Sequence, residues 1–222
     1  PESRSSVTAA LMDKGNYRHF MAKEIHEQPE VIGHTLSRYM DLGAKQVQVP
    51  GIEQADFANL NRIVISACGT AYIAGLVAKY WFESLAGLPV DVEVASEFRY
   101  RAPLLKKGGV TLFLSQSGET ADTLAALRYA KEQDQTILSV VNVTGSSIAR
   151  EADYCIQTQA GPEVSVASTK SFTSQLAVLA CLAIRASLKR KLISTSEATE
   201  FHLAFSDIPA LMQHVIEDES KF

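Results

Sequence analysis

Cysteine is scarce in this sequence. Its three cysteines, Cys68, Cys155 and Cys181, are odd in number, far apart and without a CxxC pair, so they predict neither a disulfide framework nor a zinc site. All three lie in apolar stretches, which suits the reducing conditions of the cytoplasm. We therefore expect a cytoplasmic protein that uses no metal and no cofactor.

Positive charge is not in excess, and long hydrophobic runs are missing. Lys and Arg number 21 against 25 Asp and Glu, which gives a net charge of -4. Nucleic-acid binding needs a basic face, so we expect no nucleic-acid partner. The longest nearly apolar run, residues 176–184, is too short to span a bilayer, and the first fifteen residues lack the apolar core of a signal peptide. We therefore expect no membrane partner and a soluble, intracellular chain.

Several common catalytic motifs are absent. The sequence has no GxGxxG after its first predicted strand, no GxxxxGK[ST] and no GxSxG. A dinucleotide site, a P-loop and a hydrolase serine are therefore unsupported. Glu24, Glu27 and Glu30 read as a solvated helical face rather than an acid–base pair. The histidines lack metal-ligand spacing, and we expect them at the surface or at an interface. They are His19, His26, His34, His202 and His214.

The first sixty residues are predicted to be mainly helical. The first dozen are small and polar and read as a tail or linker. One helix is predicted from about Arg18 to Glu27, ended by Pro29. A second is predicted from Pro29 to about Leu42, with Gly43 as its stop signal.

From residue 62 onward, short β-branched runs alternate with helical stretches. Alternation of this kind predicts an α/β fold, a doubly wound sandwich of a five-stranded parallel sheet covered by helices on both faces. The predicted strands are residues 62–67, 90–94, 110–114, 136–142 and 154–158, and the predicted helices are residues 70–85, 120–132, 146–151, 168–189 and 195–217. Ligands bind beyond the carboxyl ends of the strands in such folds, so function is sought in the loops that enter helices.

The loop at 115–120 is the most informative of three candidate loops. Ser115, Ser117 and Thr120 offer hydroxyl groups where a strand turns into a helix, and Gly118 allows close approach of a ligand to the backbone. The unpaired amides of a helix N-terminus bind anions, so this loop predicts a phosphate cradle made without arginine. Simple capping of the helix is the alternative. Three hydroxyls together with Gln116 favour the anion site.

The other two loops carry weaker signals. Gly69 and Thr70 suit a tight turn after the first strand, and Cys68 beside them reads as a small packing residue rather than a nucleophile. Ser168 and Thr169 lie at a predicted helix start. Lys170, which follows them, is expected to be a solvated surface charge rather than a ligand.

At these loops the sequence resembles a known family. SQSGETADT (115–123) and ASTKSFTSQ (167–175) resemble the SIS, or sugar isomerase, domain. Further segments narrow the resemblance to the isomerase region of the glutamine–fructose-6-phosphate aminotransferase (glucosamine-6-phosphate synthase) family, and to the first of its two SIS halves. These segments are residues 13–32, 68–75, 81–87 and 95–101.

The resemblance implies a function. The family's enzyme converts fructose 6-phosphate and glutamine to glucosamine 6-phosphate and glutamate, in amino-sugar (UDP-N-acetylglucosamine) biosynthesis. It implies as partners fructose 6-phosphate or glucose 6-phosphate, a second copy in a homodimer, and the glutaminase domain and second SIS domain of a full-length chain. The substrate-binding residues that it implies are Thr70, Ala71, Ser115, Gln116, Ser117, Thr120, Val166 and Ser168.

Two departures from the family pattern bear on activity. Ala71 stands where the family usually has serine, so only the backbone of that position can be carried over. The lysine, glutamate and histidine that perform the family's isomerase chemistry, and the cysteine of its glutaminase, match nothing in this sequence. We therefore assign no catalytic residue, and expect the chain alone to be inactive.

The resemblance also divides the chain. It implies a tail and lead-in helices at 1–45, a SIS domain at 46–192, and a C-terminal helix at 193–222 that leads toward a second SIS domain. The long apolar helix at 168–189 favours self-association. Two other functions stay open: a non-catalytic sugar-phosphate-sensing module and a stand-alone phosphosugar isomerase. The acidic residues near the N-terminus and the segment at 13–32 argue against them.

Overall fold

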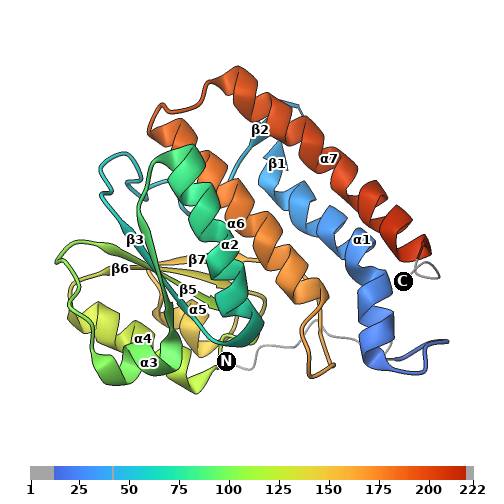
Figure 1. The fold of residues 1–222 in the computed structure, drawn as a ribbon, viewed down its shortest axis with the longest axis horizontal. Coiled ribbons are helices and arrows are strands. Elements are labelled where there is room, and N and C mark those ends of the chain that lie inside the picture. The colour runs from blue at the N-terminus through green and yellow to red at the C-terminus, as the bar shows by residue number, and fades with distance from the viewer. Residues whose placement is uncertain (1–12, 42, 219–222) are drawn as a thin grey trace.

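The computed structural model describes residues 13–41 and 43–218, so the predicted tail and Leu42 lie outside it. A parallel sheet of five strands lies at the centre of the fold (Figure 1), in the order β4-β3-β5-β6-β7. The strands are β3 (Ile63–Ala67), β4 (Val90–Val94), β5 (Val110–Ser115), β6 (Thr136–Val141) and β7 (Tyr154–Gln157). The predicted α/β class, strand count and parallel sheet are confirmed.

The register of the strands determines where their loops meet. Ile63 at the start of β3 pairs with both Val90 and Val110, so β3, β4 and β5 begin together. The chain leaves β3 toward β4 on one side and returns to β5 on the other. The crevice that receives ligands in doubly wound folds lies where the strand order reverses in this way. In this protein it falls at the carboxyl ends of β3 and β5.

Helices cover both faces of the sheet, as doubly wound topology requires (Figure 1). On one face lie α2 (Gly69–Ala86) and α6 (Lys170–Lys189), whose apolar residues form the larger core with β3 and β5. The other face is covered by three shorter helices around a second core. They are α3 (Ala95–Arg101), α4 (Ala121–Glu132) and α5 (Ser147–Glu151).

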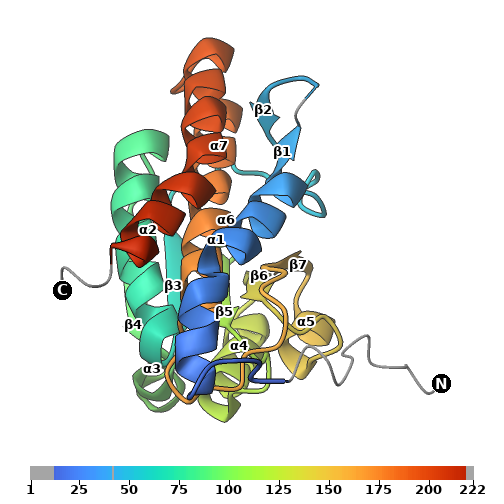
Figure 2. The same cartoon turned by 90° about the vertical axis from the view of Figure 1, so that its right-hand side faces the viewer.

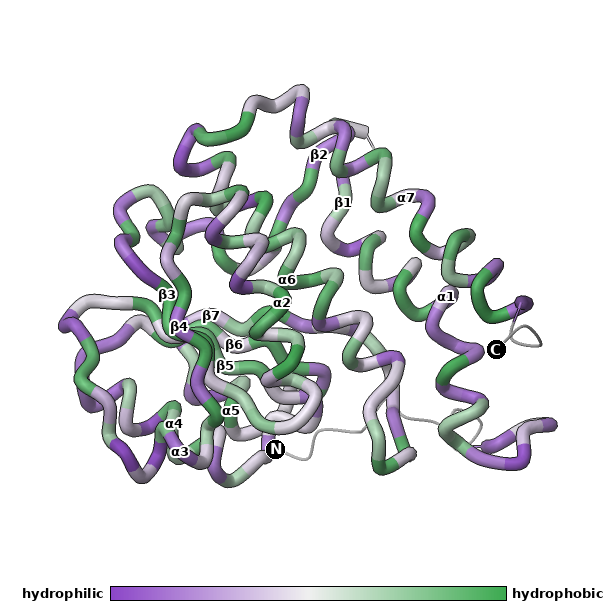
Figure 3. Tube along the Cα trace, viewed as in Figure 1, coloured by the Kyte–Doolittle hydropathy of each residue, from purple (hydrophilic) through white to green (hydrophobic). Residues whose placement is uncertain are grey.

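Two amphipathic helices form a further layer outside α6 (Figures 1 and 2). They are α1 (Phe20–Tyr39), which packs on α6, and α7 (Thr195–Glu217), which packs on α1. Hydrophobic and hydrophilic residues alternate along both helices in Figure 3, as expected of helices with one packed face. A capping box between Ser194 and Glu197 fixes the start of α7.

Helix α6 is a core helix. By length and composition alone it could cross a membrane, and among the described residues it is the one such helix. Two thirds of that stretch is buried, with Val178, Leu179 and Leu182 fully enclosed. Because α1 and α2 cover these residues, the argument that α6 has apolar surface to spare for a dimer is wrong.

Two short features of the fold are not predicted by the sequence pattern. The strands β1 (Met40–Asp41) and β2 (Gln46–Val47) pair antiparallel as a hairpin, and α3 spans seven residues. Strands of two residues and a helix of two turns are too short to show a hydrophobic period. The sequence therefore predicts neither of them.

The predicted break at Pro29 is also wrong, because α1 runs through it without interruption. Proline has no amide to donate to the carbonyl four residues earlier, which is Ile25. The side chain of Gln28 makes up the loss: its Nε2 donates to the Ile25 carbonyl at 3.1 Å. Pro29 itself is buried. Burial and the substituted hydrogen bond explain why the helix continues.

This arrangement predicts a non-additive pair of substitutions. Gln28→Met keeps size and helix propensity but removes the donor, and should lower the free energy of unfolding by about 1 kcal/mol. In a Pro29→Ala background the new amide at position 29 serves the Ile25 carbonyl, so the same substitution should then cost close to nothing. Urea denaturation of the four proteins of this cycle measures the difference. Equal costs in both backgrounds would show that the Gln28 bond contributes nothing.

Candidate functional site

Three loops converge on one cavity of about 400 Å³ beyond the carboxyl ends of β3 and β5. All eight residues predicted as substrate-binding line it. They are Thr70, Ala71, Ser115, Gln116, Ser117, Thr120, Val166 and Ser168. The structure therefore brings together side chains that lie up to 98 positions apart in sequence, between Thr70 and Ser168 (168 − 70).

The hydroxyl groups of the 115–120 loop brace the loop itself. The Ser115 Oγ accepts from the Gly118 amide at 3.0 Å and lies 3.1 Å from the Thr120 Oγ1. The Ser117 Oγ accepts from the Glu119 amide at 3.2 Å. None of these bonds caps the helix that follows: Thr120 is the N-cap residue of α4, and its side chain makes no capping bond. The amides of the first turn of α4 are thus left without a side-chain cap, next to the cavity.

Gly118 holds the tightest position in this loop. Its φ of +66° is one that residues with side chains rarely adopt, and a Cβ there would lie 1.9 Å from the Oγ of Ser146. Its carbonyl accepts from the Ile148 amide at 3.0 Å. The 115–120 loop is therefore seated directly on the segment that starts α5, and only glycine fits at the contact.

Glu119 points away from the cavity. Its carboxylate accepts from the Ser147 amide at 2.7 Å, and this bond lowers the pKa of Glu119 below its ordinary value. A carboxyl group held in its charged form is a poor proton donor. The Glu119 carboxylate therefore braces the 115–120 loop against the start of α5.

The 68–71 loop brings the start of α2 to the cavity. Gly69 has a φ of +59°, and the N-cap residue Cys68 makes no side-chain capping bond. The Cys68 thiol packs against the core beneath α4, 3.9 Å from the Thr123 hydroxyl. Ala71 is 7% exposed, so its methyl group forms part of the cavity floor.

The third loop is held by a residue that the sequence pattern does not reveal. The carboxylate of Glu163 accepts from the Ser168 hydroxyl at 2.9 Å, from the Thr169 amide at 2.8 Å and from the Ser171 amide at 3.2 Å. It thus caps the start of α6 from outside the helix. Glu163 lies seven residues before the first residue of α6 (170 − 163), beyond the three-residue spacing of a capping box, so no local motif marks it.

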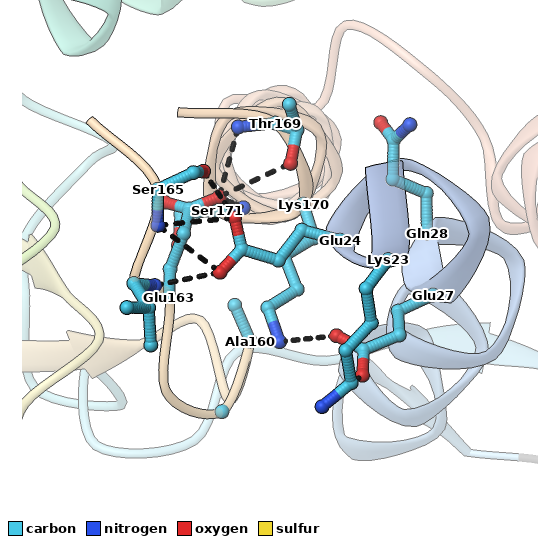
Figure 4. A network of polar contacts seen from close by, with 12 residues as sticks. Lys23, Glu24, Glu27, Gln28, Ala160, Glu163, Ser165, Thr169, Lys170 and Ser171 are labelled. Carbon is cyan, nitrogen blue, oxygen red and sulfur yellow. Dashed lines mark hydrogen bonds and ion pairs between the residues drawn. The ribbon is translucent and has the colours of Figure 1, made fainter. Parts of the chain in front are cut away.

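The expectation that Lys170 is a surface charge is wrong. Its side chain is 6% exposed, and its Nζ lies 2.7 Å from the Glu27 carboxylate (Figure 4). The expectation of a solvated face fails for Glu24 and Glu27 too: Glu24 is 2% exposed, whereas Glu30 is exposed. Helix α1 packs over the start of α6, so that Glu24 and Lys170 are buried and Glu27 is half-buried. The sequence of α1 does not show which element the helix packs against, so it does not predict this burial.

One histidine also departs from expectation. His202 on α7 is 3% exposed, and its Nδ1 has no hydrogen-bond partner. It is buried because α7 packs against α1 and the β1–β2 hairpin. The described residues contain no group of three or more acidic, histidine or cysteine side chains that could hold a metal ion.

The chemistry available in the cavity is that of binding. Among the described residues that line it, Cys68 is the one titratable side chain. Hydroxyls, the Gln116 and Gln175 amides and backbone donors can hold an anion and a polyhydroxylated chain. They cannot form the acid–base pair that moves protons between carbons.

A larger hollow of about 760 Å³ opens at the other end of the strands. Two ion pairs in its lining already join basic and acidic side chains, Arg62 with Asp91 at 3.0 Å and Arg101 with Glu93 at 2.5 Å. We place the site in the smaller cavity, where donors are gathered at helix N-termini.

The fold and the cavity define an α/β domain of the doubly wound class whose ligand site lies at the helix N-termini beyond β3 and β5. The SIS domain family matches residues 56–185, well over half of the chain. The protein belongs to the SIS domain family. The match falls inside the SIS domain predicted at 46–192, and the outer boundaries of the predicted segments stay a prediction.

Relatives with assigned names are close in sequence. The chain is 56% identical over 216 residues to a glutamine–fructose-6-phosphate aminotransferase (isomerizing) of Bradyrhizobium diazoefficiens, which covers 97% of this chain and 36% of that protein. It is 52% identical over 221 residues to the protein of the same name from Brucella abortus, covering 100% of this chain and 36% of the relative. The chain thus spans about a third of the length of the curated relatives it matches.

Solved structures agree. The C-terminal domain of glucosamine-fructose-6-phosphate aminotransferase from Francisella tularensis aligns with a TM-score of 0.84 and 38% identity, over 90% of this chain and 56% of that one. A glucosamine-6-phosphate deaminase from Thermotoga maritima aligns with a TM-score of 0.65 at 21% identity, over 83% of this chain and 52% of that one. The second likeness shows a shared fold alone.

The seat of Gly118 gives a testable prediction. Gly118→Ala should lower the free energy of unfolding by roughly 2–5 kcal/mol, from the strain of a positive φ and the overlap with Ser146. The matched control is Gly145→Ala: Gly145 is not among the glycines of positive φ, and no atom within 4 Å opposes a Cβ there. It should leave stability unchanged or slightly raised. Thermal and urea unfolding compare the two variants, and equal effects would contradict this account of the loop.

Proposed function

We propose that this chain is the phosphosugar-holding half of the isomerase region of a glucosamine-6-phosphate synthase, and that it binds fructose 6-phosphate or glucose 6-phosphate in the 400 Å³ cavity. One observation carries the proposal: the first turn of α4 has no side-chain cap and opens beside three hydroxyl groups. A phosphate dianion is the ligand that such a helix terminus favours.

The ligand's orientation follows from the three loops. The phosphate group takes the amides at the start of α4 and the hydroxyls of Ser115, Ser117 and Thr120, which need rotate only slightly to donate. The sugar then extends toward Thr70 and the 166–168 segment on the opposite wall. Ala71 contributes only its backbone and methyl group there. The net charge of -4 does not oppose binding, because a few pre-placed donors decide affinity for a small anion.

The relatives support a biosynthetic enzyme over a sensor. Those at 52–56% identity are named isomerizing aminotransferases. A non-catalytic sugar-phosphate-sensing module is therefore not favoured. As part of a longer chain, the protein would convert fructose 6-phosphate and glutamine to glucosamine 6-phosphate and glutamate, with a glutaminase domain supplying ammonia and a second SIS domain completing the site.

The surroundings that suit this function are also proposals. We propose a cytoplasmic location, supported by three cysteines that form no disulfide. We propose a homodimer as well. Its support lies on α7, where Leu211 and Val215 are 59% and 64% exposed on one helical face.

Loss of one cradle hydroxyl tests the binding site. Ser117→Ala should weaken the binding of fructose 6-phosphate by about 1.5–3 kcal/mol, the usual worth of a hydrogen bond to a charged group. Isothermal calorimetry measures the affinity. Ser84→Ala is the control, because Ser84 is an exposed serine near the far end of α2 and bonds only to its own helix. Equal affinities for the two variants would count against the cradle.

Turnover is expected to be absent in the 222-residue chain even where binding is present. Opening a ketose ring, condensing it with ammonia and moving a proton between adjacent carbons all need placed acids and bases. The described lining of the cavity supplies only the Cys68 thiol as a titratable group. The assay incubates the chain with fructose 6-phosphate and excess ammonium and measures amino sugar. Robust formation of glucosamine 6-phosphate would overturn the half-site proposal.

Self-association is tested by sedimentation. The chain should form dimers at micromolar concentration, and Leu211→Arg should shift it to monomers because a charge then replaces an apolar contact on α7. Tyr100→Ser on α3 removes a side chain that is 77% exposed elsewhere on the surface and should leave the dimer intact. A monomer at every concentration would refute the homodimer.

A further inference from the structure

Helix α1 carries a buried carboxylate that bonds to the loop forming one wall of the cavity. The carboxylate does not itself line the cavity. Glu24 is 2% exposed and is not among the cavity-lining residues. Its carboxylate accepts from the Val164 amide at 2.6 Å, from the Ser165 amide at 3.3 Å and from the Ser165 hydroxyl (Figure 4). One side chain from the start of the chain therefore gathers three donors from a loop about 140 residues later.

The segment held in this way carries the wall residues of the site. Val166 and Ser168 line the cavity one and three positions after Ser165, and the Ser165 hydroxyl also lies within bonding distance, 2.8 Å, of the Ala167 carbonyl. Val166 itself is fully exposed, so no packing of its own side chain holds it in place. The position of the 166–168 segment therefore depends on polar bonds from its neighbours.

Two other acidic residues secure the ends of the same segment. Glu163 caps the start of α6, and Glu27 on α1 binds the buried Nζ of Lys170 at 2.7 Å. Glu24 thus bonds α1 to the loop, and Glu27 bonds α1 to α6. Burying a charged group costs several kcal/mol. Such contacts therefore stabilise the fold only when all the donors around the charged group are in place.

We propose that Glu24 is a positioning residue of the phosphosugar site: it fixes the 164–168 segment against α1, so that the segment meets the sugar while the 115–120 loop separately holds the phosphate. This inference rests on the proposed function. It assigns a role to the lead-in helix α1, which contributes no residue to the cavity lining and bonds to the loop that does. Glu24 touches no ligand, and its effect reaches the site through backbone amides.

The two halves of the ligand allow a direct test. In Glu24→Gln one acceptor oxygen stays but becomes neutral, and the other is replaced by an NH2 group that cannot accept from Ser165, so the loop is held less firmly and leaves its binding position for part of the time. Apparent affinity falls in proportion to the fraction of molecules whose loop stays in the binding position. We expect about tenfold weaker binding of fructose 6-phosphate by calorimetry. Inorganic phosphate, which needs only the 115–120 loop, should bind as before when followed by amide chemical shifts.

The control and the local readout use the same helix. Glu30→Gln makes the same chemical change at an exposed position on α1 and should alter neither affinity. Hydrogen exchange at the Val164 and Ser165 amides should accelerate in Glu24→Gln and not in Glu30→Gln, because their bonds to a buried carboxylate are weakened. Should Glu24→Gln fail to fold, Ser165→Ala serves instead. It removes one of the three donors, and about a threefold loss of sugar-phosphate affinity is expected.

The outcomes separate this inference from the function beneath it. Failure of the unaltered chain to bind either ligand overturns the proposed function, and this inference with it. Binding of fructose 6-phosphate by the unaltered chain and by Glu24→Gln with equal affinity overturns this inference alone. An equal loss for fructose 6-phosphate and inorganic phosphate also overturns it, because a general loosening of the fold would then explain the effect.

Discussion

Parallel pairing of β3 with β5 is the constraint on which the site depends. Their common start at Ile63 and Val110 brings their carboxyl ends to one edge of the sheet. Each end leads into a helix N-terminus that no side chain caps, at α2 and at α4. Unpaired amides are costly to bury and favour anions. Two such termini side by side create a site whose preference for negative charge comes from the backbone and not from arginine or lysine.

The hydroxyl groups in this site both hold the loop and face the cavity. Ser115 and Ser117 hold the backbone of their loop, and the same oxygen atoms face the cavity. A loop braced in this way loses little conformational freedom when a ligand arrives, which preserves binding energy. The hydroxyls therefore order the loop without capping α4, and the uncapped helix terminus stays open to the anion site that we propose.

Sequence was sufficient for the five strands of the sheet, for the longer helices after residue 62 and for the three loops, because hydrophobic periodicity and helix-start signals are local. It failed where a distant segment supplies the partner. From sequence, Lys170 is expected to be a surface charge and Glu24 to be solvated. In the structure α1 lies beside Lys170, and the 164–168 loop covers Glu24. Pro29 is predicted to end a helix because proline usually does, whereas its burial and the Gln28 side chain, which bonds the Ile25 carbonyl, let the helix continue. The resemblance supplied Val166, which nothing in its own chemistry marks as a site residue.

Bonds between Glu24 and Ser165 join residues 141 positions apart, so α1 is synthesised well before the loop that it holds. Closing a chain loop costs entropy that rises by about 0.6 kcal/mol with each doubling of its length. Contacts of this separation slow folding, because the intervening strands must be ordered before the closure becomes favourable. We therefore expect the wall of the cavity that α1 supports to order late in folding, with the Glu24 carboxylate hydrated until the sheet and α6 are in place.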